Sequence, residues 1–141
     1  MKIRNKIELS YYNLHFNFDL RGHLTIIDGD TSSGKSMFCE LLTLIRCNDD
    51  RYADCQVFSY KYPFSLEILK ALKNKLIIID NGDILLNEGI VEYIAGDYNN
   101  QYIIIARQPF DFGVSPNYYA EIQEKDNKFY LEYFDNAKGW Y

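Results

Sequence analysis

The stretch that decides the fold is LTIIDGDTSSGKSMFCELL, residues 24–42. Its apolar run stops at Gly29, and small or polar residues follow as far as Ser36. After them Phe38, Leu41 and Leu42 recur at the spacing of one face of an α-helix, and Ile45 continues the pattern. The stretch therefore predicts a strand over residues 23–28, a loop, and a helix over residues 35–46.

The loop matches the pattern G-x-x-x-x-G-K-[ST] from Gly29 to Ser36. Glycines let the backbone come close to an anion, and successive backbone N–H groups can then point at phosphate oxygens. The start of the following helix adds positive potential, Lys35 can reach the outer phosphates, and the Ser36 hydroxyl can bind Mg²⁺. The alternative is an ordinary glycine-containing turn. The residues expected to contact the nucleotide are Gly29, Asp30, Thr31, Ser32, Ser33, Gly34, Lys35, Ser36 and Met37.

A second apolar run, LIIID at residues 76–80, ends in a carboxylate. A continuous apolar run of this length is typical of a strand covered on both faces. A nucleoside triphosphate site needs a carboxylate at the end of such a strand to hold Mg²⁺, and Asp80 fits that role. The alternative is a hairpin, because Asn81-Gly82 follows at once and that dipeptide favours two-residue turns.

On these two motifs the chain resembles the P-loop NTPases. Gly29 to Ser36 is similar to their Walker A motif and Asp80 to their Walker B aspartate, over roughly residues 23–107. The resemblance implies Mg²⁺ with ATP as the ligand. Within the AAA- and ABC-like ATPases, a strand after Walker B ends in a polar residue that faces the terminal phosphate, and Arg107 has that place along the chain. Arg107 could instead pair with Asp80 or Asp83, or lie in solvent.

The chain also departs from those ATPases. They carry a glutamate base directly after the Walker B aspartate, whereas this chain has Asn81, whose amide can orient a water molecule but cannot accept its proton. Asp83 could act as the base if its loop folds back. The ABC signature LSGGQ and the AAA lid domain are absent from the sequence. A guanine-reading N-K-x-D motif is also absent after the loop, which favours ATP over GTP.

The rest of the chain predicts one α/β domain over residues 1–141, with a mainly parallel sheet and flanking helices. Alternating apolar residues indicate antiparallel strands before the loop and a terminal β-hairpin around Asp126-Asn127. Further predicted elements are strands at 56–60 and 102–106, a helix starting at Pro63 and Ser65 with Ile68, Leu69 and Leu72 inward, and a helix capped by Asn87 with Ile90, Val91 and Ile94 on one face.

Composition limits the possible partners. The net charge of -5 argues against nucleic acid, which usually requires a basic surface. Three cysteines with no zinc-binding spacing and no secretory signal favour a reducing, cytoplasmic location. No apolar run approaches the roughly 20 residues that span a membrane. The 13 tyrosines are expected on half-exposed strand faces.

Three functions are compatible with these features. The first is a small ATP-binding protein with weak or partner-dependent hydrolysis, which acts as a switch or accessory subunit through a protein partner or self-association. The second is a small-molecule phosphotransferase, for which only Arg46 and Arg51 lie near the helix after the loop. The third is an interaction module that has lost nucleotide binding and uses the terminal hairpin and its tyrosines.

Overall fold

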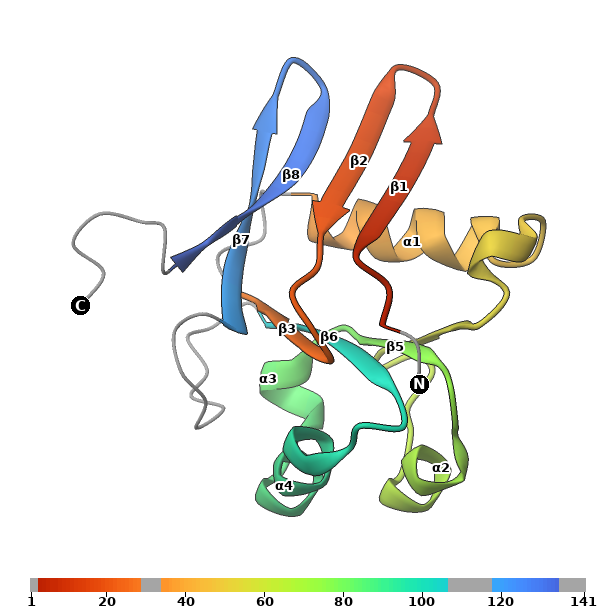
Figure 1. Ribbon diagram of the computed structural model, residues 1–141, viewed down its shortest axis with the longest axis vertical. Coiled ribbons are helices and arrows are strands. Elements are labelled where there is room, and N and C mark those ends of the chain that lie inside the picture. The colour runs from red at the N-terminus through yellow and green to blue at the C-terminus, as the bar shows by residue number, and fades with distance from the viewer. Residues whose placement is uncertain (1–2, 29–33, 107–117, 135–141) are drawn as a thin grey trace.

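The strands form one mixed, mostly parallel sheet with helices against it (Figure 1). The computed structural model describes residues 3–28, 34–106 and 118–134. The strands are β1 Lys6–Tyr11, β2 Leu14–Asp19, β3 Leu24–Ile27, β4 Cys55–Phe58, β5 Leu76–Ile79, β6 Gln101–Ile105, β7 Tyr119–Lys125 and β8 Lys128–Tyr133. The helices are α1 Lys35–Ile45, α2 Leu66–Ala71, α3 Gly82–Leu85 and α4 Glu88–Gly96, with a short 3₁₀ helix at Asp50–Tyr52. The predicted α/β class is confirmed.

The order of the strands across the sheet is β1-β2-β8-β7-β3-β6-β5-β4. The N-terminal pair β1–β2 and the C-terminal pair β7–β8 are antiparallel hairpins, as predicted, and they lie next to each other because β2 pairs with β8 in parallel. From β7 to β4 every further pairing is parallel. Strands β3, β6, β5 and β4 therefore all end at the same edge of the sheet.

Strand β5 lies between two parallel neighbours, β4 and β6, and its residues are completely buried. The hairpin alternative at Asn81-Gly82 is therefore wrong. The chain enters α3 instead, and Asn81 is the N-cap of that helix. Burial on both faces explains why the strand reads as a continuous apolar run rather than an alternating one.

Each face of the sheet has its own apolar core. Helix α1 covers one face, where Phe38 packs with Phe16 and Phe18 from the N-terminal hairpin. The other face packs against α2, α3 and α4 through residues such as Leu69 and Ile94. The predicted inward position of Ile68 is wrong, since its side chain is 43% exposed. Helix α2 is only six residues long, so it presents a narrow apolar stripe in which Leu69 is the buried member.

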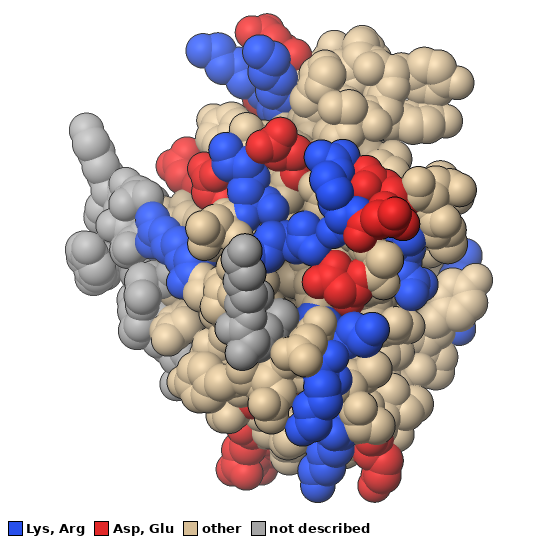
Figure 2. All heavy atoms as spheres, turned by 45° about the vertical axis from the view of Figure 1, so that its right-hand side comes forward, with Lys and Arg blue, Asp and Glu red and all other residues tan. Residues whose placement is uncertain are grey.

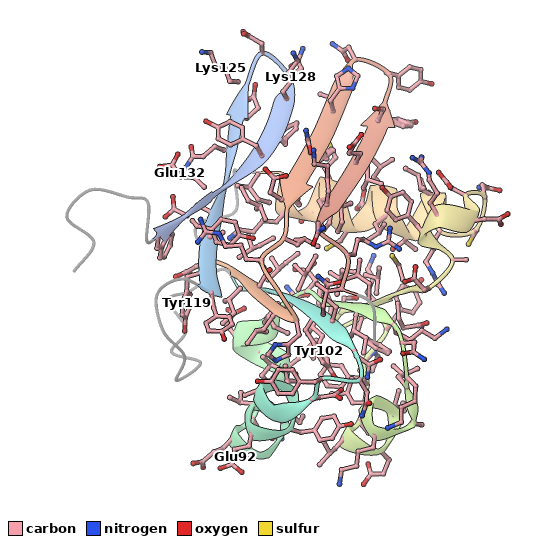
Figure 3. The ribbon with its side chains drawn as sticks, viewed as in Figure 1. Glu92, Tyr102, Tyr119, Lys125, Lys128 and Glu132 are labelled. Atoms are coloured by element: carbon pink, nitrogen blue, oxygen red, sulfur yellow. The ribbon has the colours of Figure 1, made fainter. Side chains whose placement is uncertain are left out.

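The local signals for helix starts and turns are confirmed in detail. Ser65 caps α2 by accepting the N–H of Ile68 at 3.3 Å, and Asn87 caps α4 by accepting the N–H of Ile90 at 2.9 Å. Asp126 and Asn127 both adopt positive φ, 54° and 64°, which is the two-residue turn that matches the twist of a hairpin. The side chains of Lys125 and Lys128 flank this turn at the tip of the β7–β8 hairpin (Figure 3).

A buried polar cluster joins β6 to the end of α4. The Tyr102 hydroxyl donates to Asp97 Oδ2 at 2.6 Å, and Asn100 Nδ2 donates to the same oxygen at 2.9 Å. The N–H of Asn99 donates to Asp97 Oδ1 at 3.0 Å. Burial and the hydrogen bond to Asp97 raise the pKa of Tyr102. The ring of Tyr102 points from β6 toward the helical layer below it (Figure 3). A buried carboxylate is tolerated here because these donors replace water.

Charged side chains of both signs are interspersed on the face shown in Figure 2. Two short ion pairs lie among the described residues: Arg4 Nη2 is 2.8 Å from Asp54 Oδ1, and Arg51 Nη2 is 2.8 Å from Asp49 Oδ2. The Arg51 guanidinium lowers the pKa of Asp49 through hydrogen bonds.

Among the helices of the described residues, none is both long and apolar enough to cross a membrane.

Removal of one donor from the buried cluster should destabilise the fold. Tyr102→Phe keeps the ring but leaves Asp97 with one hydrogen bond fewer, so we expect the free energy of unfolding to fall by about 1–3 kcal/mol. Urea denaturation followed by circular dichroism measures this change. Tyr12→Phe is the matched control, because Tyr12 is 86% exposed and should change stability by less than about 0.5 kcal/mol. Equal stability of the two variants would contradict the prediction.

Candidate functional site

Lys35 lies at the edge where the parallel strands end. It is the first residue of α1 and is only 4% exposed. Its Nζ donates to the carbonyl oxygen of Ala106 at 3.0 Å. Ala106 directly follows β6, and its own N–H donates to the carbonyl of Ile27 at the end of β3. The ammonium group therefore lies over the end of β6, the strand between β3 and β5.

Gly34 precedes Lys35 and requires the conformational freedom of glycine. Its φ is +83°, and a Cβ at this position would lie 2.9 Å from Phe129 Cε1. The Gly34 carbonyl accepts the N–H of Phe38 at 2.9 Å, which starts α1. The aromatic ring of the terminal hairpin thus packs directly on the backbone at the start of the helix. Only a residue without a side chain fits there.

The remaining loop residues fall partly outside the described region. Gly29, Asp30, Thr31, Ser32 and Ser33 lie outside it, and their predicted phosphate contacts stay predictions. Met37 is in the first turn of α1 and is 43% exposed. Its predicted backbone contact to a nucleotide also stays a prediction.

Ser36 and Asp80 line the same groove, which has a volume of about 730 Å³. Ser36 comes from the first turn of α1, and Asp80 follows β5. Asp80 is half-buried, and its Oδ1 accepts the N–H of Asn81 at 2.8 Å. The structure therefore places the two predicted metal ligands in the lining of one groove. One hydroxyl and one carboxylate are a suitable protein contribution to Mg²⁺, whose other ligands are waters and phosphate oxygens.

Asn81 also lines this groove and has a backbone conformation that explains its identity. Its φ and ψ are 58° and 40°, in the left-handed region, and it is only 6% exposed. Its carbonyl accepts the N–H groups of Ile84 and Leu85, both at 2.9 Å, so it starts α3. Asparagine adopts left-handed conformations more readily than glutamate does. The chain therefore has asparagine at a position where the local backbone disfavours the glutamate that the resemblance leads one to expect.

The structure does not place the other two predicted catalytic residues, Asp83 and Arg107, in the groove lining. Asp83 lies in the first turn of α3, half-buried, and is not among the described residues that line the groove with Asp80 and Asn81. Arg107 lies outside the described residues. Both catalytic roles stay predictions.

Sequence reasoning missed Glu40, a second carboxylate of the groove. Glu40 is one helical turn after Ser36 and lines the same groove, and the i, i+4 spacing is the signal that could have found it. Burial raises the pKa of Cys39 well above its usual value, and the charges of Asp80 and Glu40 add to the effect. Asp80 and Glu40 are therefore both acidic residues of the groove that lie near the buried thiol of Cys39.

No family model matches the sequence, and no match was found among curated proteins.

Replacement of Asn81 should show the cost of its backbone conformation. Asn81→Glu places a larger, charged side chain at a buried left-handed position beside Asp80, so we expect a loss of about 1–2 kcal/mol or more in the free energy of unfolding. Asn81→Gly permits the same φ without strain and should be the more stable of the two variants. Urea denaturation of both variants measures the difference. A glutamate variant as stable as the glycine variant would contradict this account.

Proposed function

We propose that this protein binds ATP together with Mg²⁺ at the loop of residues 29–36 and hydrolyses it only weakly or with the help of a partner. The observation that carries this proposal is the position of Lys35. Its ammonium group is buried over the end of β6, between the strand that leads into the loop and the strand that leads to Asp80. A cation held at this edge can meet the outer phosphates of a nucleotide whose phosphates follow the loop.

The residues near Lys35 fit the rest of such a ligand. Gly34 leaves room for the Phe129 ring at the start of α1. The first backbone N–H groups of α1 have no partner within the helix and could donate to phosphate oxygens. Ser36 and Asp80 would hold Mg²⁺ from the two walls of one groove. When bound, the metal neutralises phosphate charge and orients the terminal phosphate.

Weak hydrolysis follows from the groups that surround this position. The Asn81 amide cannot accept a proton from water. The carboxylates among the described residues that line the groove are Asp80, assigned to the metal, and Glu40 on the exposed surface of α1. A partner or a second copy could supply the missing group in trans. ATP is proposed over GTP because no guanine-reading motif follows the loop.

The contacts of the terminal hairpin support a switch function. The N–H of Asp28, at the end of β3, donates to the carbonyl of Ala120 in β7 at 2.9 Å. At the other end of the loop, Phe129 of β8 packs on Gly34. The hairpin therefore contacts both residues that flank 29–33. A change of loop conformation on nucleotide binding would be transmitted to the hairpin, whose exposed face, with Tyr130, could contact a protein partner.

Binding of Mg-ATP and Mg-ADP to the isolated protein tests the proposal most directly. Lys35→Ala removes a charge-assisted contact worth about 1.5–3 kcal/mol, so we expect the Kd to rise about tenfold or more. Asp80→Asn keeps the shape of the side chain and should weaken binding only when Mg²⁺ is present. Calorimetry with and without Mg²⁺ measures both effects.

Lys70→Ala is the matched control for the lysine variant, because Lys70 is exposed on α2 and should bind nucleotide like the wild type. Thermal unfolding checks that each variant is folded. Absence of binding by the folded wild-type protein would favour an interaction module that has lost its nucleotide site.

Phosphate release from Mg-ATP tests the weak-hydrolysis part separately. We expect the isolated protein to turn over far more slowly than about 1 s⁻¹, the low end of ordinary enzyme rates. Rates are measured over a range of protein concentrations, since a contribution in trans would make the specific activity rise with concentration. Turnover of many ATP molecules per second by the dilute monomer would contradict this part of the proposal.

A further inference from the structure

The groove that contains Ser36 and Asp80 is longer than a magnesium site requires. It follows α1 from Ser36 to Arg46, ten residues apart in the sequence, which corresponds to about 15 Å along a helix. Its opposite wall is β4 together with the turn at residues 59–62. The volume of about 730 Å³ is within the range of pockets for small molecules.

Arg46, at the far end of this groove, has unused hydrogen-bonding capacity. Its Nε is buried and has no hydrogen-bond partner among the described residues. Within the same part of the chain, its Nη2 makes a long contact of 3.5 Å to Gln56 Oε1. Buried donors without an acceptor are rare in proteins, because each has lost its water without a replacement. A guanidinium group matches the paired oxygens of a phosphate or carboxylate group.

The turn after β4 contributes a second cation and several hydroxyl groups. Ser59 and Tyr62 exchange backbone hydrogen bonds of 3.2 Å and 3.0 Å, which positions Lys61 between two exposed tyrosines, Tyr60 and Tyr62. All four residues line the groove, and Thr43 faces them from α1. The lining combines two cations, Arg46 and Lys61, and several hydroxyl groups with the carboxylates of Glu40 and Asp80. The cations and hydroxyl groups suit the anionic, hydroxylated part of a ligand.

We propose that this groove is a second ligand site, which binds a small hydroxylated molecule with a phosphate monoester group and holds that phosphate at Arg46. Two cations, Arg46 and Lys61, match the double negative charge of a phosphate monoester better than the single charge of a carboxylate. From this anchor the groove continues toward Ser36 and Asp80, where the proposed function places the terminal phosphate of ATP. The phosphate anchor at Arg46 does not depend on ATP binding.

Calorimetric titration of the full chain with glycerol 3-phosphate tests this site. Glycerol, which lacks the phosphate group, is the control ligand. We expect the wild type to bind the phosphate ester and not glycerol. Arg46→Gln and Lys61→Gln should each weaken this binding, Arg46→Gln at least about tenfold, because it removes a charged hydrogen-bond donor. Arg51→Gln is the matched control, since Arg51 lies outside the groove and pairs with Asp49.

Lys35→Ala separates this site from the loop, which could itself bind a phosphate. Glycerol 3-phosphate binding that survives Lys35→Ala but is weakened by Arg46→Gln supports the second site. Binding that Lys35→Ala abolishes and neither groove variant changes would overturn it, as would absence of binding by the wild type. Lys61 is exposed, so its variant should fold even if Arg46→Gln does not. Binding of Mg-ATP by the same samples shows separately whether the proposed nucleotide function holds.

Discussion

The hydrogen bond from Lys35 Nζ to the carbonyl of Ala106 connects the first turn of α1 to the end of β6. This contact is possible only because β6 lies between β3 and β5, so the strand that follows β5 in the chain becomes the neighbour of the strand that precedes the loop. The same arrangement brings Asp80 to the edge where α1 begins. The geometry of the site thus depends on the strand order more than on any single side chain.

The terminal hairpin is a structural support of this edge. Strand β7 pairs with the end of β3, and Phe129 of β8 stacks on Phe16 at a centroid distance of 4.5 Å while its edge lies against Gly34. Both hairpins therefore belong to the apolar core on the α1 side of the sheet. The hairpin therefore contacts Asp28 and Gly34, the described residues on either side of 29–33.

Binding and chemistry have separate requirements at this site. In the proposed site, binding needs a cation together with a hydroxyl and a carboxylate for the metal, and these roles are proposed for Lys35, Ser36 and Asp80. Hydrolysis needs in addition a base aligned with water. The left-handed backbone at Asn81, set by the start of α3, disfavours a glutamate at that position. The structural demand of a helix start therefore limits which side chain can follow Asp80.

The sequence by itself determined the local features. The strand–loop–helix unit, the caps at Ser65 and Asn87 and the turn at Asp126-Asn127 depend on residues close in the chain, so periodicity and turn chemistry predict them. Only the tertiary structure decided the order of the strands, the outward position of Ile68 and the extension of the groove to Arg46. These depend on contacts between residues far apart in the sequence, and local propensity carries no information on such contacts. Asn81-Gly82 depends on both: the dipeptide alone favours a two-residue turn, but β5 has parallel neighbours on both sides, so a helix follows it and not a hairpin.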